Sequence, residues 1–234
     1  TDRPHRNFYG RLKGKTLKSS QRTYLAEDLA ALSPGLVSWE DNPARAPLDL
    51  AALFGERPVW LEVGFGGGEH LLWQAENNRG AGLIGCEPFE DGVVKVLREI
   101  DDSDLVNVRV HNDDARDVLR WLPENSVSRA FVLFPDPWPK VRHRKRRLVN
   151  ISFLEALARI MRDGAELRIG TDIGDYARTI LIALRQVAVF EWTATCPLDW
   201  RKRTDDWPET RYERKAGREG RCCYFFSLRK MEKA

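Results

Sequence analysis

Hydrophobic residues along the chain alternate between short apolar runs and stretches with helical periodicity. The runs are short enough for buried strands and lie at residues 59–63, 82–86, 106–110, 130–134 and 166–169. The stretches that follow place apolar side chains three and four positions apart, which is typical of helices packed on a sheet; they lie at residues 69 onward, 91–100, 114–121, 148–161 and 176–187. This alternation predicts a doubly wound α/β fold.

The two ends of the chain depart from this alternation. Two further apolar runs, 190–195 and 222–228, have no clear helix between them, so we expect these strands to pair antiparallel. The predicted fold class is therefore a Rossmann-like, doubly wound, seven-stranded α/β sheet, mostly parallel with an antiparallel C-terminal strand. Residues 1–20 are polar and predict a basic, mobile N-terminal arm, and a helix is expected over residues 21–32. Residues 21–234 are expected to form a single domain.

Composition narrows the class of protein. The chain has 234 residues, 42% of them hydrophobic and 31% charged, which suffices for one substantial core and excludes a disordered composition. No apolar run approaches the roughly 18 residues of a membrane span, and the N-terminus does not resemble a signal peptide, so a cytoplasmic protein without membrane contact is expected. Four cysteines without CxxC spacing and scattered histidines predict reduced thiols and no metal site. Nothing in the sequence indicates an obligatory protein partner.

Positive charge is concentrated in two places, although the net charge is only +3. The segment 1–24 is rich in lysine and arginine, and Asp2 is its only acid. The second cluster is the run from Arg142 to Arg147, which has no intervening acid. Such clusters on an otherwise acidic body predict a localised polyanion contact. The alternatives for the run are a solvated charged face and a nuclear-localisation signal.

A glycine-rich segment follows the first predicted strand, and an acid leads it. The residues run Glu62-Val63-Gly64-Phe65-Gly66-Gly67-Gly68-Glu69, and Glu69 stands where the dinucleotide pattern GxGxxG requires glycine. A carboxylate beside the loop suits a cofactor with ammonium and sulfonium groups better than a pyrophosphate. The segment resembles motif I of S-adenosylmethionine-dependent methyltransferases. The alternative is a plain strand-to-helix turn.

Two further acids follow the next two predicted strands. The separation of Glu87 from Gly64 is close to the spacing of roughly 20 residues at which an acid accepts hydrogen bonds from ribose hydroxyls. Asp114 precedes Ala115, and the methyltransferase class has a similar step beside adenine, where the acid accepts from the exocyclic amine and the Ala115 N–H meets a ring nitrogen. Asp114 is equally suited to cap the following helix.

The fourth predicted strand ends in Phe134-Pro135-Asp136-Pro137-Trp138-Pro139-Lys140. Closely spaced prolines forbid a helix and predict a stiff loop at the edge where open α/β sheets bind ligands. A stiff loop carrying Asp136 and Trp138 is a suitable platform for a flat base. Trp138 is equally consistent with stacking on a base and with burial in the protein.

Four sequence segments together resemble the bacterial tRNA (guanine-N7)-methyltransferase family, which modifies guanine 46 in the variable loop: FPDPWPK, RHRKRR, GTD and TRYERKA. The resemblance covers roughly residues 20–230 and implies S-adenosylmethionine as cofactor and tRNA as partner. It implies that Glu62, Glu87, Asp114 and Asp136 contact the methyl donor, beside the loop glycines Gly64 and Gly66. It assigns substrate binding to Lys140, Asp172, Thr210, Arg211, Tyr212 and Glu213, and RNA contact to Arg142, His143, Arg144, Lys145, Arg146 and Arg147.

Methylation at guanine N7 requires little chemical assistance from an enzyme. N7 carries an in-plane lone pair and no proton, so its attack on the sulfonium methyl group requires no general base. Catalysis then comes from orientation and from stabilising the cationic purine. Asp136 suits both tasks, because its carboxylate accepts from guanine N1–H and the exocyclic amine and its charge favours the positive ring. We therefore expect Asp136 to be the central catalytic residue.

Three other functions remain open at this point. A methyltransferase acting on another RNA, a small molecule or a protein would keep the cofactor and change the acceptor. An NAD-dependent dehydrogenase is disfavoured by Glu69 in the glycine segment. An RNA-binding module without activity is disfavoured by the acids that follow the strands.

Overall fold

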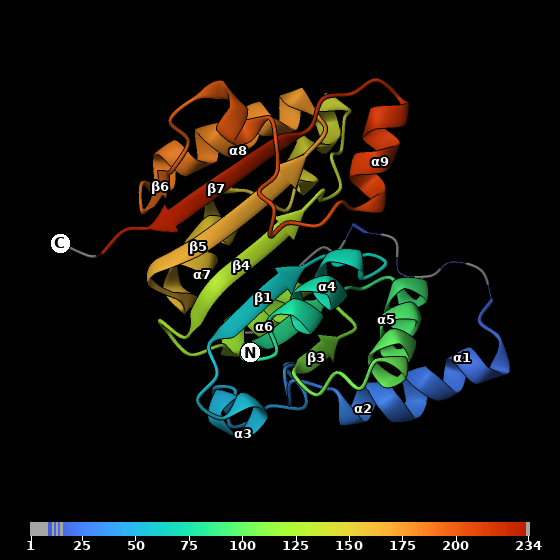
Figure 1. The fold of residues 1–234 in the computed structure, drawn as a ribbon. Coiled ribbons are helices and arrows are strands. Elements are labelled where there is room, and N and C mark those ends of the chain that lie inside the picture. Colours follow the sequence, from blue (N-terminus) through green and yellow to red (C-terminus); the bar gives the residue numbers. More distant parts are fainter. Residues whose placement is uncertain (1–8, 11, 13, 15, 233–234) are drawn as a thin grey trace. The chain divides into compact units, whose positions relative to one another are not determined.

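The computed structural model describes residues 9, 10, 12, 14 and 16–232, and its seven strands form one sheet in the order β3-β2-β1-β4-β5-β7-β6 (Figure 1). The pairs β2–β3 and β4–β5 are parallel, whereas β7 is antiparallel to both β5 and β6. The predicted fold class is confirmed. The strands are β1 (Val59–Val63), β2 (Gly82–Cys86), β3 (Val108–His111), β4 (Val127–Leu133), β5 (Met161–Thr171), β6 (Phe190–Trp192) and β7 (Tyr224–Lys230).

The chain divides into two compact units, and the first contains residues up to Val59 together with 64–123. Strand β2 is buried along its whole length, as its continuous apolar sequence requires of a parallel strand covered on both faces. The helices of this unit are α1 (Ser19–Thr23), a π-helical turn (Tyr24–Asp28), α2 (Leu29–Ala31), α3 (Leu50–Phe54), α4 (Glu69–Asn77), α5 (Glu90–Asp102) and α6 (Ala115–Trp121). The expected arm at residues 1–20 lies largely outside the described residues, and α1 begins at Ser19.

The second unit contains residues 60–63 and 124 to the C-terminal end. In this unit β5 lies between β4 and β7, and α7 and α8 contact each other and β5 (Figure 1). Fully buried side chains of the strands and of these helices form its core, among them Leu61, Phe131, Leu157 and Tyr176. The helices are a 3-10 turn (Val141–Arg146), α7 (Ile151–Ile160), α8 (Gly174–Val187), a second 3-10 turn (Pro197–Trp200) and α9 (Arg211–Arg218). The expectation of a single domain stays a prediction.

Most strands and helices differ from the expected bounds by a few residues, and three differences affect the site or the sheet most. Helix α7 begins at Ile151, because the Asn150 side chain accepts a hydrogen bond from the Phe153 N–H at 3.1 Å and caps the helix there. Strand β5 begins at Met161, earlier than expected, across a register irregularity opposite Val127 and Arg129. The segment expected to be a loop between the last two strands contains helix α9.

A buried arginine on β5 binds the segment that leads to α9. The Arg168 side chain is 4% exposed, and its Nη2 lies 2.8 Å from an Asp206 oxygen while its Nε lies 2.8 Å from Glu166 Oε1. Although burial alone raises the pKa of Asp206, hydrogen bonds from Arg168 and Thr204 lower it well below its ordinary value. Trp207, which follows Asp206, is itself buried and packs edge-on against Phe225 at 5.1 Å between ring centroids. This cluster holds residues 206–207 on the sheet.

We expect Asp206→Asn to lower the free energy of unfolding at pH 7 by about 2 kcal/mol, because it removes one of two carboxylates from a buried guanidinium. A carboxyl whose pKa is lowered on folding stabilises the protein above its unfolded pKa of about 4, and this contribution is lost as the pH falls toward the folded pKa. The difference between the two proteins should therefore narrow below about pH 4. Urea unfolding at several pH values measures the difference in free energy of unfolding. Asp205→Asn, which changes the exposed neighbour, is the control. Equal losses of stability in Asp206→Asn and Asp205→Asn would contradict the role of the ion pair.

Candidate functional site

The glycine segment after β1 forms a tight turn that leads into α4. Gly64, Gly66 and Gly68 have φ angles of 76°, 57° and 82°, a region that favours glycine. The Gly64 N–H donates to the Cys86 carbonyl oxygen at 2.8 Å, so the turn is attached to the end of β2. Backbone amides in such a turn approach a ligand without interference from Cβ atoms.

Glu87 fastens the same turn. Its Oε2 accepts from the Gly66 N–H at 2.7 Å, and its Oε1 accepts from the Phe89 N–H at 2.9 Å. The residue is only 8% exposed. A carboxylate has about four acceptor positions, so these two hydrogen bonds are compatible with acceptance from a ribose hydroxyl. The expected ligand role of Glu87 is thus combined with a structural one.

Gly92, in the first turn of α5, is a site residue that the sequence reasoning missed. A Cβ atom at this position would lie 2.1 Å from the Gly66 carbonyl oxygen. Glycine is therefore required for α5 to approach the turn as closely as it does. The available indication was the glycine itself, since glycine inside a helix costs about 1 kcal/mol relative to alanine and needs a reason.

Asp114 is the N-cap of α6, as the alternative interpretation anticipated. Its side chain accepts from the Arg116 N–H at 2.9 Å and also forms an ion pair with the Arg116 guanidinium. This hydrogen bonding raises the pKa of Arg116 despite the opposing effect of burial. Ala115 is the first residue of α6 and is buried, and Glu62 is buried within β1. Adenine contact by Asp114 and Ala115 and donor contact by Glu62 stay predictions.

In the second unit, the proline-rich loop after β4 is conformationally constrained. Phe134 and Trp138 have φ angles of 52° and 42°, which residues other than glycine seldom adopt. Such strain is tolerated where the surroundings fix the backbone, and it often marks functional loops. Asp136 lies between these two residues with its side chain exposed, and desolvation nevertheless raises its pKa.

Arg147 fixes this loop, and its expected contact with RNA stays a prediction. Its side chain is 1% exposed. Its Nε donates to the Pro137 carbonyl oxygen at 2.9 Å, and its Nη2 lies 2.6 Å from Asp175 Oδ2. The guanidinium also lies over the Tyr176 ring at 4.8 Å. The last arginine of the basic run therefore anchors the Asp136 loop to the start of α8.

The rest of the basic run forms a 3-10 turn, and its side chains differ in exposure and in the residues they contact. Arg144 is exposed and pairs with Asp175 at 2.9 Å. Arg146 lies over the Trp138 ring at 5.0 Å, and His143 packs edge-on against the same ring at 5.9 Å. Trp138 is thus contacted by two side chains of the 3-10 turn and is half-buried. Stacking on a base and burial in the protein therefore both stay open as its role. Arg142 and Lys145 are exposed and are the run's best-placed residues for phosphate.

We expect Arg142→Ala/Lys145→Ala to weaken tRNA binding and to lower the log–log salt slope by about 2, because each lost phosphate contact reduces the slope by about 0.9. Arg147→Ala should instead lower the melting temperature, since it removes the loop anchor. Filter binding at several salt concentrations and thermal unfolding separate the two effects. An unchanged slope in the double variant would show that the run faces solvent.

The expected substrate segment caps and begins α9. Thr210 is buried, and its hydroxyl accepts from the Glu213 N–H at 3.3 Å. Glu213 pairs with Arg203 at 3.1 Å, yet desolvation raises its pKa. Tyr212 is 43% exposed and stacks on Phe134 with ring centroids 6.3 Å apart. The structure therefore brings the Thr210–Glu213 segment against the base of the Asp136 loop.

The remaining expected substrate residues are placed differently. Asp172, after β5, pairs with Arg221 at 2.8 Å and is largely enclosed. Lys140 and Arg211 are exposed. Between residues 16 and 232, no helix is long and apolar enough to cross a membrane, and no group of three or more metal-ligating side chains lies together.

Comparisons with known proteins identify relatives of this chain. A family described as a putative methyltransferase matches residues 56–226. A tRNA (guanine-N(7)-)-methyltransferase of Ruegeria pomeroyi is 57% identical over 231 residues, covering 99% of this chain and 97% of the relative. One of Roseobacter denitrificans is 54% identical over 226 residues, covering 97% of both chains.

Solved structures share the fold at low sequence identity. The 16S rRNA methyltransferase KamB matches with a TM-score of 0.56 at 14% identity, covering 77% of this chain and 92% of its own. An antibiotic-related methyltransferase matches with a TM-score of 0.54 at 17% identity, covering 80% of this chain and 98% of its own. These likenesses concern the fold alone.

Proposed function

Because the chain belongs to the tRNA (guanine-N7)-methyltransferase family, we propose that it transfers the methyl group of S-adenosylmethionine to N7 of guanine 46 in the variable loop of tRNA. The observation that carries the proposal is the stack of Tyr212 on Phe134. It joins the loop of Asp136 to the Thr210–Glu213 segment, which lies far from that loop along the chain. A tRNA substrate supports a cytoplasmic location, which we propose for this protein.

The turn after β1 and the acids near it are suited to the methyl donor. The amides of the turn at Gly64 and Gly66 and the acceptor capacity of Glu87 match the ribose end of S-adenosylmethionine. Glu62 and Asp114 add negative charge for a ligand that carries an ammonium and a sulfonium group. The sulfonium makes the methyl group electrophilic, so the protein needs only to hold the donor in place for attack.

The second unit supplies the acceptor chemistry. Asp136 accepts hydrogen bonds from guanine N1–H and the exocyclic amine, and its negative charge stabilises the purine as N7 becomes cationic. No residue has to remove a proton from N7 before attack. The rigid loop favours this role, because Arg147 and the Phe134 stack limit the movement of the carboxylate. Lys140, Asp172, Arg211, Tyr212 and Glu213 are the proposed further substrate contacts.

Methyl transfer to an unmodified tRNA transcript tests the proposal. The purified protein, labelled S-adenosylmethionine and tRNA should give labelled 7-methylguanosine, mapped by chemical cleavage at position 46. Replacing guanine 46 by adenine in the transcript is the matched control and should abolish the label. Label at another nucleotide, or none in tRNA, would favour a methyltransferase with another acceptor.

A further inference from the structure

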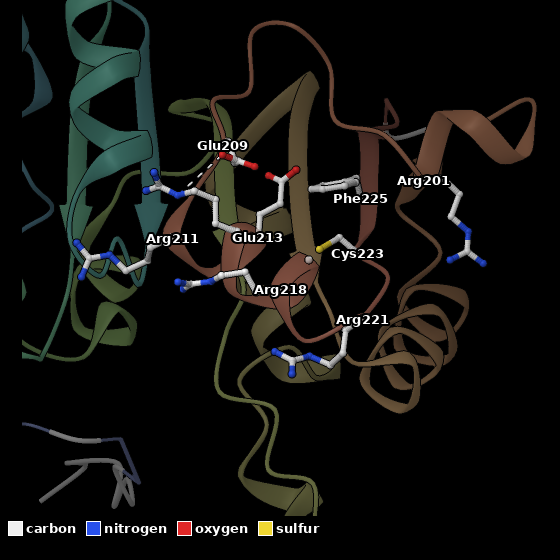
Figure 2. Close-up of a pocket in the computed structure, with 10 residues that line it drawn as sticks. Arg201, Glu209, Arg211, Glu213, Arg218, Arg221, Cys223 and Phe225 are labelled. Atoms are coloured by element: carbon white, nitrogen blue, oxygen red, sulfur yellow. Dashed lines mark ion pairs between the residues drawn. The ribbon is translucent and has the colours of Figure 1, made fainter.

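A pocket on the second unit, beside α9, has arginine at half of its lining residues. Its volume is about 660 Å³. Figure 2 shows Arg211 and Arg218 extending from the same side of α9. The lining also contains Arg201, Glu209, Glu213, Arg214, Gly217, Arg221, Cys223 and Phe225. Five arginines against two glutamates leave the lining strongly positive.

Helix geometry gathers three of these arginines. Arg211, Arg214 and Arg218 are spaced three and four positions apart, so they lie on one face of α9. Ala216 is the buried contact of the helix on the opposite side. The sequence of α9 thus directs its basic face toward the pocket and its small apolar residue toward the core.

Arg201 is placed by aromatic contacts. Its guanidinium lies over the Trp200 ring at 4.2 Å and over the Tyr224 ring at 4.9 Å. These two rings are themselves stacked, with centroids 6.1 Å apart and an interplanar angle of 7°. A guanidinium held on an aromatic surface keeps its N–H donors at the edge for a ligand. Its order also reduces the entropy lost on binding.

The pocket's own acids do not neutralise it. Glu213 is engaged by Arg203, which lies outside the lining, at 3.1 Å. Glu209 lies 3.8 Å from Arg214, a long contact between exposed groups. Arg218 forms no ion pair with any residue that the structure describes. Arg221 is paired with Asp172 at 2.8 Å outside the lining, so Arg201 and Arg218 are the guanidinium groups best placed for an external anion.

We propose that this pocket binds phosphates of the RNA backbone, as a second phosphate contact beside the basic run. The charge disfavours the methyl donor as its occupant, because the ammonium and sulfonium groups of the donor outweigh its single carboxylate. A neutral guanine base does not require a cluster of guanidinium groups, whereas backbone phosphates are bound bidentately by them. The inference rests on the proposed tRNA substrate, and it assigns RNA contact to Arg201 and Arg218.

The test is Arg201→Ala/Arg218→Ala with unmodified tRNA as the probe. Binding should weaken by about tenfold, and the log–log salt slope should fall by about 2. The KM for tRNA should rise while kcat and the affinity for S-adenosylmethionine stay unchanged, since neither arginine touches the reacting atoms in the proposed mechanism. The control is Arg162→Ala, an exposed arginine near the opposite end of β5 from Thr171.

The two possible failures are distinguishable. A double variant whose tRNA affinity and salt slope equal those of Arg162→Ala overturns the phosphate pocket. Wild-type protein that binds tRNA but transfers no methyl group to it overturns the proposed function, while the slope of the double variant still decides the role of the pocket. Far-UV circular dichroism of both variants verifies that the exposed substitutions leave the fold intact.

Discussion

Asp136→Ala is expected to lower kcat by about 10³-fold while changing the tRNA dissociation constant by no more than a few fold. The carboxylate is exposed on a loop whose ends are fixed by the Arg147–Pro137 hydrogen bond and the Phe134–Tyr212 stack. Removing it leaves the phosphate contacts in place but takes away the acceptor for guanine N1–H and the charge that balances the cationic purine. Single-turnover methylation together with filter binding measures both quantities. Unchanged turnover would remove Asp136 from the mechanism.

Asp136→Asn separates charge from orientation. The amide keeps the size of the side chain and one acceptor oxygen but cannot balance a positive ring. We expect Asp136→Asn to retain part of the orientation of guanine and to lose most of the electrostatic stabilisation of the cationic purine. Desolvation raises the pKa of Asp136, so wild-type activity should fall as the pH drops through a pKa above that of an ordinary aspartate. The asparagine variant should lack this acidic limb, and a limb that persists in it would arise from another group.

The sheet was predictable from the sequence because buried strands appear as short runs of apolar residues. A parallel strand covered on both faces must be largely apolar, and β2 satisfies this along its whole length, as does β4 from Ala130 onward. The residues that follow such strands meet at one edge of the sheet. The position after a strand, together with the spacing from Gly64 for Glu87 and the proline-rich loop for Asp136, therefore identified both as candidates.

Helix α9 and the anchor Arg147 were not predictable in the same way. The segment 206–216 is highly charged, so apolar periodicity does not reveal its helix, and Thr210 with Glu213 three positions later was the available capping pattern. Arg147 belongs to a run of similar residues, and sequence does not distinguish the buried member from its exposed neighbours. Its burial depends on Asp175 and Tyr176, which belong to another element, the first turn of α8.

Gly92→Ala is expected to weaken S-adenosylmethionine binding by at least about tenfold, because displacements of about 1 Å at a binding site carry costs of this order or more. The added Cβ atom would lie 2.1 Å from the Gly66 carbonyl oxygen, so either α5 or the turn at Gly66 must move. The turn is the part that holds Glu87 through the Gly66 N–H. Its displacement therefore disturbs the glycine amides and the ribose acceptor together.

Helix propensity makes this test discriminating. Alanine is the better helix former by about 1 kcal/mol, so a purely local view predicts that the variant is more stable and binds the donor normally. The structure predicts the opposite for donor affinity, measured by calorimetry, with tRNA affinity unchanged. Gly80→Ala is the matched control in the same unit, since a Cβ atom there meets nothing within 4 Å. If Gly92→Ala and Gly80→Ala bind the donor equally well, the close approach of α5 to the turn is not required for the site.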